Sequence, residues 1–284
     1  MGISTIGVVG AGQMGSGIAQ VAAVSGIEVL LCDVSTEGLI KSKGRIEQSL
    51  LKLCEKGKLT AAEVSKAKQR IQTTQHLEEL SRTDLVIEAA SENPQLKFEI
   101  FRKLDSICRD DVILSTNTSS ISITEIAAQT RRPDRVVGMH FMNPVPLMKL
   151  IEVIRGLRTS DETFRAVRAL GEKMGKDCIE SKDFPGFVVN RILMPMINEA
   201  CYALFEGLAS AQDIDNAMKL GTNQPMGPLT LADFIGLDTC LAILNVMHDG
   251  LGDPKYRPCP LLKQYVAAGL LGKKSGQGFH KYGV

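Results

Sequence analysis

The chain has 284 residues, 44% of them hydrophobic, with 33 basic and 32 acidic side chains and a formal net charge of +1. This length supports a full hydrophobic core and more than one domain, and the composition is that of an ordinary globular protein. A charge this close to zero argues against a nucleic-acid-binding surface, so no nucleic-acid partner is expected.

The cysteines, histidines and apolar runs exclude further classes of protein. Seven scattered cysteines without close pairs suit a reducing compartment, and we expect a cytoplasmic protein. The four histidines lie far apart, so no metal site is predicted. The most apolar long run, residues 187–205, is not expected to span a membrane because it carries Asn190, Arg191, Asn198 and Glu199. No basic segment precedes the first apolar strand, so no secretion signal is expected.

The first part of the chain predicts strands that alternate with helices. Strands are expected at residues 3–9, 28–32, 84–90, 112–115, 135–138, 149–154 and 177–181. Helices are expected from residue 16, at 38–57, 60–71 and 95–107, and after capping pairs Ser122 with Glu125 and Thr159 with Glu162. This alternation is typical of an α/β domain.

The first predicted strand runs into the turn Gly10-Ala11-Gly12-Gln13-Met14-Gly15, and the second ends at Asp33. A glycine turn between strand and helix, with an acid at the end of the next strand, is the fingerprint of a dinucleotide-binding unit. Gly10 allows the tight turn, Gly12 lets the backbone approach a pyrophosphate, and Gly15 lets the helix pack on the strand. Asp33 can accept hydrogen bonds from the adenine-ribose hydroxyls and would repel a 2′-phosphate, so NAD is favoured over NADP. The alternative is a glycine-rich turn without a ligand.

The two helices at 38–57 and 60–71 predict a hairpin inserted into this alternation, with Thr60 and Glu63 as a capping box. One face of the first helix is apolar, and the opposite face is basic: Lys41, Lys43, Arg45, Lys52 and Lys56. A solvated helix face is the favoured interpretation from the residues alone. The alternative is a surface that meets a second phosphate-bearing ligand.

Polar loops follow two of the predicted strands, at residues 91–94 and 116–120. The carboxyl ends of strands are where an open α/β sheet holds its ligands. Ser119 can offer a hydroxyl donor to a substrate oxygen or to a proton relay. The alternative is that these loops are polar only because loops usually are.

His140 lies where the strand at 135–138 ends, and the prolines that follow it, Pro144 and Pro146, force a turn. In the next strand Glu152 stands among aliphatic residues, where burial of its carboxylate would be unfavourable unless a donor meets it. The nearest titratable candidate is His140. A histidine held by a glutamate is a general base with a fixed tautomer and a stabilised imidazolium. The alternative is a Glu152 that faces water and a His140 bonded to the backbone.

The segment Asp183-Phe184-Pro185-Gly186 predicts a boundary between domains 1–184 and 185–284. The second domain is predicted to be helical, with helices at 187–206, kinked near Pro195, at 210–220 and at 229–248, and a basic glycine-punctuated loop at 272–279. A helical domain this apolar predicts pairing with a second copy, so a homodimer is expected.

Taken together, the motifs resemble those of the L-3-hydroxyacyl-CoA dehydrogenases, most closely the short bacterial 3-hydroxybutyryl-CoA dehydrogenases. The resemblance covers nearly the whole length and rests on the glycine turn, Ser115–Ser120, His140–Pro146, Pro185–Arg191 and Gly272–Gly276. It implies a Rossmann-type NAD-binding domain with a helical hairpin insertion, followed by an all-α domain that carries most of the dimer contact. It also implies an acyl-CoA substrate, interconverted between the (S)-3-hydroxy and 3-oxo forms by hydride transfer.

By match of motif, the resemblance assigns roles to particular residues. His140 takes the general-base position, Glu152 that of its orienting carboxylate, and Ser119 and Asn190 those of groups that assist catalysis. Ser49, Lys56 and Ser119 fall at substrate positions, the first two at the CoA moiety, which reverses the solvated-face interpretation of the hairpin. Cofactor positions fall on Gly10, Ala11, Gly12, Gln13, Met14, Gly15, Asp33, Glu92, Lys97, Ser119, Asn143 and Lys274.

Two other functions stay open at this point. One is a two-domain β-hydroxyacid dehydrogenase, which would use a lysine where this chain has Asn190. The other is a non-catalytic NAD-binding structural protein, against which the intact set of His140, Glu152 and Asn190 argues.

Overall fold

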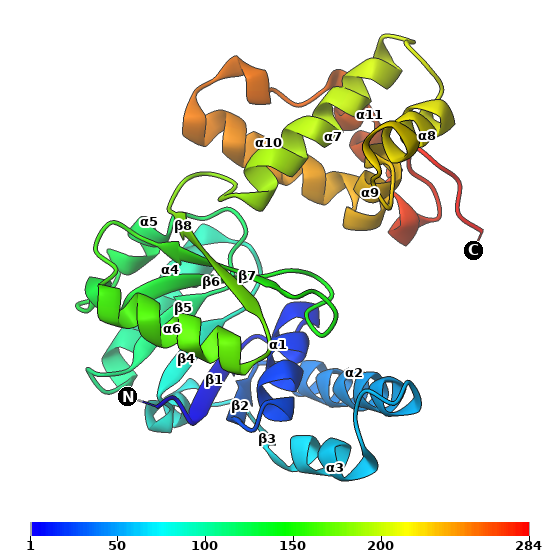
Figure 1. Ribbon diagram of the computed structural model, residues 1–284. Helices are drawn as coiled ribbons and strands as arrows, with labels where there is room; N and C mark the ends of the chain where they lie inside the picture. Colours follow the sequence, from blue (N-terminus) through cyan, green and yellow to red (C-terminus); the bar gives the residue numbers. More distant parts are fainter. Residues whose placement is uncertain (1, 284) are drawn as a thin grey trace. The chain divides into compact units, whose positions relative to one another are not determined.

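The computed structural model describes residues 2–283 and divides into two compact units, residues 1–184 and 185–284, here called unit 1 and unit 2. Unit 1 is an α/β unit built on one sheet, and unit 2 is helical (Figure 1). The expected fold class, a Rossmann-like NAD-binding domain followed by a helical domain, is confirmed.

Unit 1 contains an eight-stranded sheet in the order β3-β2-β1-β4-β5-β6-β7-β8, with only β6 and β7 antiparallel. The strands are β1 (Thr5–Val9), β2 (Glu28–Cys32), β3 (Ile71–Thr74), β4 (Leu85–Glu88), β5 (Ile113–Thr116), β6 (Val136–Phe141), β7 (Leu150–Arg155) and β8 (Asp177–Lys182). The first six follow the strand order of a doubly wound dinucleotide-binding sheet. Their parallel carboxyl ends therefore meet at one edge of the sheet.

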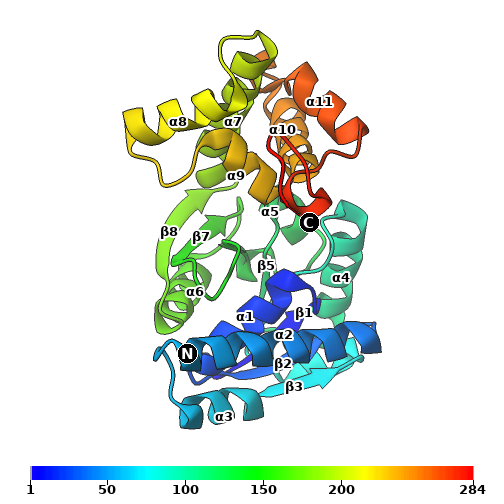
Figure 2. The same cartoon turned by 90° about the vertical axis from the view of Figure 1, so that its right-hand side faces the viewer.

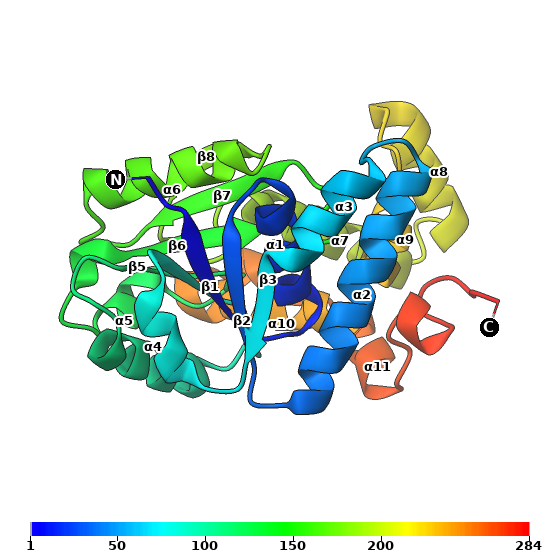
Figure 3. The same cartoon turned by 90° about the horizontal axis from the view of Figure 1, so that it is seen from below.

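Helices cover both faces of this sheet (Figure 3). They are α1 (Gln13–Val24), α2 (Thr36–Glu55), α3 (Ala61–Gln69), α4 (Pro94–Ile107), α5 (Ile123–Ala127) and α6 (Asp161–Lys173), with short 3-10 turns η1 (Leu77–Arg82) and η2 (Pro133–Arg135). One buried cluster joins α1, α2, α3 and α6 to the strands through Ile18, Leu39, Val64 and Val167. The expected hairpin is thus α2 and α3, which lie side by side, and Thr60 and Glu63 form the predicted capping box.

Two local expectations in unit 1 are wrong. The helix expected to reach Ile71 ends at Gln69, and Ile71–Thr74 forms strand β3 at the edge of the sheet. Its β-branched residues suit a strand, but four residues are too few to be seen beside a helix. Helix α6 is capped by Ser160, whose hydroxyl accepts from Thr163 N, whereas the hydroxyl of Thr159 donates to Val136 O.

Unit 2 consists of α7 (Val189–Phe205), α8 (Ala211–Thr222), α9 (Pro228–Ile235), α10 (Leu237–Leu251) and α11 (Pro260–Ala267), with η3 (Pro254–Tyr256) and η4 (Lys273–Ser275) (Figures 1 and 2). The single helix expected at 229–248 is two helices bent by 97°, because Gly236 adopts a φ of +101° that breaks the hydrogen-bond ladder. Helix α11 was not anticipated. Buried residues from α7, α9, α10 and α11 share one core, including Ile197, Leu229, Leu244 and Leu262.

Among residues 2–283, no single helix has the length and apolar character needed to cross a membrane. By those two criteria alone, α9 and α10 qualify as a bent pair, and both contribute buried residues to the core of unit 2.

Candidate active site

The glycine turn forms a cradle with open space in front of it. A methyl group added at Gly10, where φ is +102°, would lie 2.6 Å from Ala89 O, and one at Gly15 would lie 1.8 Å from Gly10 O. A methyl group at Gly12 would meet nothing within 4 Å, and no side chain caps the N-terminus of α1. Backbone N–H groups and the positive end of the helix dipole are thus available to a phosphate, so the turn fits a dinucleotide.

Asp33, which directly follows β2, is hydrogen-bonded to the glycine turn. Its Oδ2 accepts a 2.6 Å hydrogen bond from Ala11 N, and its Oδ1 accepts one from Ser35 N at 2.9 Å. A cleft of about 830 Å³ begins here, lined by Gly10, Gly12, Asp33, residues 75–78 and one side of α4. Asp33 therefore lies between the glycine turn and this cleft.

Arg45, expected on the basic face of the hairpin, is exposed and also forms hydrogen bonds to the glycine turn and the start of α1. Its Nη2 donates to Ala11 O at 2.5 Å and to Ser16 Oγ at 3.1 Å. The two residues predicted to bind the CoA moiety belong to α2: Ser49 is partly buried, and Lys56, the C-cap of the helix, is exposed. Ser49 and Lys56 are seven positions apart, which is about two helical turns, so their side chains project from similar sides of α2.

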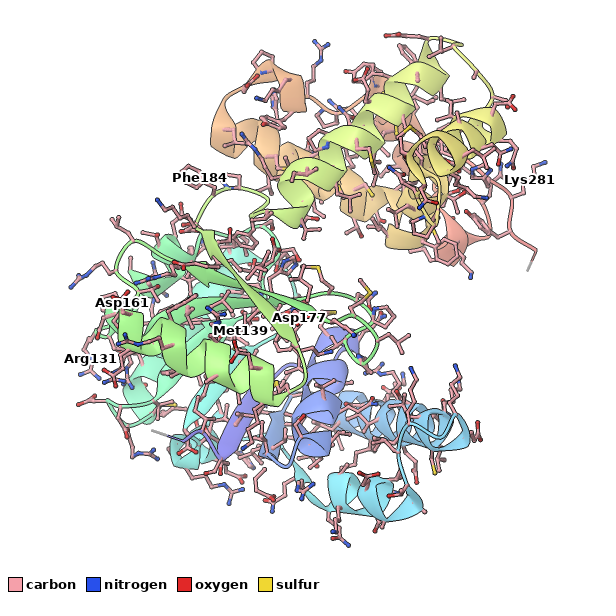
Figure 4. All side chains as sticks on the ribbon, in the orientation of Figure 1. Arg131, Met139, Asp161, Asp177, Phe184 and Lys281 are labelled. Carbon is pink, nitrogen blue, oxygen red and sulfur yellow. The ribbon has the colours of Figure 1, made fainter. Side chains whose placement is uncertain are left out.

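His140 and Glu152 are directly paired across the antiparallel strands β6 and β7. Nδ1 of His140 lies 2.7 Å from Glu152 Oε2, and the two side chains are 7% and 0% exposed. This burial rules out the alternative in which Glu152 faces water. An ionised carboxylate can only accept a hydrogen bond, so opposite a charged Glu152 the proton of a neutral imidazole lies on Nδ1 and Nε2 is the acceptor. Met139, which precedes His140 in β6, is labelled in Figure 4.

Ser119 approaches the other imidazole nitrogen. Its Oγ lies 3.0 Å from Nε2 of His140, at the carboxyl edge of the sheet. The loop that carries it is held by Glu92, whose Oε1 accepts from Thr118 Oγ1 at 2.5 Å, Ser119 N at 2.8 Å and Ser120 Oγ at 2.9 Å. Burial raises the pKa of Glu92, but the charge of Lys97 and these three donors outweigh it, so the pKa is lowered and the carboxylate is ionised.

Two residues beneath this loop form a buried ion pair. Nζ of Lys97 lies 2.7 Å from Glu88 Oε1 and 3.3 Å from Glu92 Oε2, and Glu88 is fully buried. Glu88 was missed by the sequence analysis, although an acid that ends an apolar strand was a usable signal. Asn117, also missed, accepts from Phe141 N at 2.9 Å and so joins the loop to β6.

The other predicted residues divide between the two units. Asn143, after β6, accepts a 2.8 Å hydrogen bond from Gln13 Nε2, which joins its loop to the glycine turn. In unit 2, Asn190 is 8% exposed in the first turn of α7, and Lys274 pairs with Asp238 at 2.6 Å. Unit 1 by itself therefore assembles the turn, Asp33, Glu92, Ser119, Asn143 and the His140–Glu152 pair.

Comparison with known proteins identifies the family. Residues 5–184 match the model of the 3-hydroxyacyl-CoA dehydrogenase NAD binding domain, and residues 186–282 match the C-terminal domain of the same family. The chain belongs to the 3-hydroxyacyl-CoA dehydrogenase family. It is therefore an NAD-dependent oxidoreductase.

Relatives in this family match nearly the whole length of the chain. It is 60% identical to the probable 3-hydroxybutyryl-CoA dehydrogenase of Bacillus subtilis, over 99% of this chain and 98% of that one. It is 52% identical to the 3-hydroxybutyryl-CoA dehydrogenase of Bradyrhizobium diazoefficiens, over 99% and 96%. The crystal structure of (S)-3-hydroxybutyryl-CoA dehydrogenase from Ralstonia eutropha superposes with a TM-score of 0.97 at 53% identity, covering 99% of this chain and 100% of that one.

Proposed function

We propose that the chain interconverts (S)-3-hydroxybutyryl-CoA and acetoacetyl-CoA, with His140 and Glu152 as the general acid–base pair. The observation that carries this proposal is the chain of contacts Ser119–His140–Glu152, with the carboxylate fully buried at the ligand-binding edge of the sheet. The four-carbon substrate is inferred from the names of the relatives at 52% and 60% identity.

His140 supplies the acid–base step in this mechanism. Nε2 of the neutral imidazole removes the proton of the 3-hydroxyl group, and NAD+ supplies the acceptor for the hydride from C3. Glu152 then faces an imidazolium at 2.7 Å and stabilises the charge that has formed. In reduction the imidazolium returns its proton to the 3-oxo oxygen. Catalysis of this kind accelerates a reaction by about 10²–10⁴-fold.

The remaining residues bind and orient. Ser119 donates to the substrate oxygen from a loop that Glu92 holds in place, and Asn190 assists in positioning the substrate. Ser49 and Lys56 bind the CoA moiety, with the ammonium of Lys56 facing phosphate. The NAD site comprises Asp33 at the ribose, Glu92, Lys97, Ser119, Asn143 and Lys274, with the pyrophosphate on the residues of the turn, Gly10, Ala11, Gly12, Gln13, Met14 and Gly15.

We further propose that the protein is a cytoplasmic homodimer joined through unit 2. Exposed apolar side chains on unit 2 support the dimer: Ile192, Phe205, Leu208, Leu220 and Phe234. All seven cysteines are free, which agrees with a reducing compartment.

The test is a spectrophotometric assay of NADH oxidation with acetoacetyl-CoA, followed by a rate series over C4 to C16 3-oxoacyl-CoA substrates. Turnover with acetoacetyl-CoA and the highest kcat/KM at C4 are expected. Turnover of a free 3-hydroxy acid but of no CoA thioester would favour a β-hydroxyacid dehydrogenase. NADH binding without turnover of either substrate would favour a non-catalytic NAD-binding protein.

A further inference from the structure

The ion pair between Glu88 and Lys97 lies beneath the candidate active site and has no part in the proposed acid–base step. The side chain of Glu88 is fully buried, and that of Lys97 is 1% exposed. Buried charges of this kind are retained only where nearly every donor and acceptor is satisfied, since a lone charge in the interior is strongly destabilising.

Glu88 meets that condition at the carboxyl end of β4. Its Oε1 accepts from Lys97 Nζ and from Ala90 N, both at 2.7 Å. Its Oε2 accepts from Lys97 Nζ at 2.9 Å and from Thr116 Oγ1 at 2.7 Å. Glu88 thus ties together the ends of β4 and β5, the two strands whose loops carry Glu92 and Ser119.

The ammonium of Lys97 lies between the carboxylates of Glu88 and Glu92. Its three protons face both oxygens of Glu88, Ala90 O at 3.4 Å and Glu92 Oε2 at 3.3 Å. This geometry makes the ammonium a bridge between two carboxylates, one buried and one at the Ser119 loop.

Glu92 connects the buried ion pair to the loop that carries Ser119. While its Oε2 is held by Lys97, its Oε1 accepts from three donors in residues 118–120, among them the backbone N–H of Ser119. Ser119 Oγ in turn lies 3.0 Å from His140 Nε2. The sequence of contacts from Glu88 to His140 is therefore continuous through Lys97, Glu92 and Ser119.

We propose that Glu88 is a positioning residue that acts through Lys97 and Glu92 to place the Ser119 hydroxyl against His140. The proposal rests on the proposed dehydrogenase function of this site. Glu88 is too deeply buried to touch substrate or cofactor, so its replacement isolates the positioning effect. A displacement of Ser119 by a fraction of an ångström affects the transition state more than it affects the binding of NADH.

The main variant is Glu88→Gln, which keeps the shape of the side chain and removes its charge. The matched control is Asp105→Asn, which also breaks a buried ion pair: Asp105 Oδ1 lies 2.8 Å from Nε of Arg132. Asp105 is about 16 Å along α4 from Pro94, the first residue of that helix. At saturating NADH, Glu88→Gln should lower kcat for acetoacetyl-CoA by about tenfold or more, with the Kd for NADH within about threefold of the wild type. Asp105→Asn should leave both constants unchanged even if it lowers Tm.

Lys97→Met and the double variant Glu88→Gln/Lys97→Met complete the test. Lys97→Met should lower kcat at saturating NADH and also raise the Kd for NADH, because Lys97 belongs to the proposed NAD site. The double variant removes both charges, so it should recover Tm relative to Lys97→Met without recovering kcat, and it carries the test if either single variant fails to fold. An unchanged kcat in Glu88→Gln at saturating NADH would overturn the positioning role. Absence of acetoacetyl-CoA turnover in the wild type would instead overturn the proposed function.

Discussion

Replacing Glu152 by glutamine tests the proposed acid–base pair through a charge that the structure places 2.7 Å from the imidazole and fully out of solvent. Two unit charges about 4 Å apart interact by about 4 kcal/mol at an effective dielectric constant of about 20. The glutamine amide keeps the shape and can still accept a hydrogen bond, but it cannot balance an imidazolium. Since about 1.4 kcal/mol corresponds to tenfold in rate, Glu152→Gln should lower kcat by about 10²–10³-fold.

The assay is oxidation of (S)-3-hydroxybutyryl-CoA across a range of pH, with the Kd for NADH and the circular dichroism spectrum as controls for folding. Both controls should match the wild type.

A double-mutant cycle with His140→Gln decides whether the two residues act as one unit. His140→Gln should lower kcat at least as much as Glu152→Gln, and the double variant should be little worse than the worse single variant. Additive losses in the two single variants would mean that the residues act separately. In that case the general acid–base pair would have to be abandoned, even if the protein turns over its substrate.

Four further predictions follow from other parts of the molecule. The ratio of kcat/KM for NADH over NADPH should exceed one, and Asp33→Ala should narrow it mainly through the KM for the cofactor; a wild-type ratio at or below one would contradict the role of Asp33. Lys56→Ala should raise the KM for acetoacetyl-CoA about two- to fivefold at low salt, less at high salt, and leave the Kd for NADH unchanged, whereas Lys41→Ala at the other end of α2 should change neither. Light scattering at micromolar concentration should give a dimer mass, and a monomer mass would refute pairing through unit 2. Burial raises the pKa of Asp105, but hydrogen bonds from Arg131 and Arg132 outweigh it and hold the pKa below 3.8. The ionised Asp105 therefore stabilises the folded protein above about pH 4, and this contribution is lost as the pH falls further. The acid-induced fall in Tm should be shallower in Asp105→Asn than in the wild type.

The sequence by itself determined the features that depend on neighbouring residues. The glycine turn was recognisable because its steric requirements are local: a positive φ at Gly10 and no room for a methyl group at Gly15. The capping box of Thr60 and Glu63 was recognisable for the same reason, since its two hydrogen bonds span three residues. Family membership followed from the same short motifs, and the match over nearly the whole chain confirmed it.

Local sequence patterns did not predict the break between α9 and α10 or the short edge strand β3. The apolar run from α9 into α10 predicted one helix, and only packing in unit 2 selects the +101° conformation that Gly236 can adopt at little strain. Strand β3 exists because β2 offers it a partner, with Val29 opposite Ile71, and an isolated four-residue segment has no such partner.

The tertiary structure alone decided which side chains of the site meet. Glu152 could have faced water, and it faces His140 because the antiparallel register of β6 and β7 pairs these two residues directly. A shift of one residue in that register would have turned Glu152 to the opposite face of the sheet. Glu88 and Lys97 likewise carry no local signal of their contact with the Ser119 loop, because β4, α4 and the loop after β5 converge only when the sheet has formed. Long-range pairing of strands fixes these distances, and a pattern of neighbouring residues does not encode them.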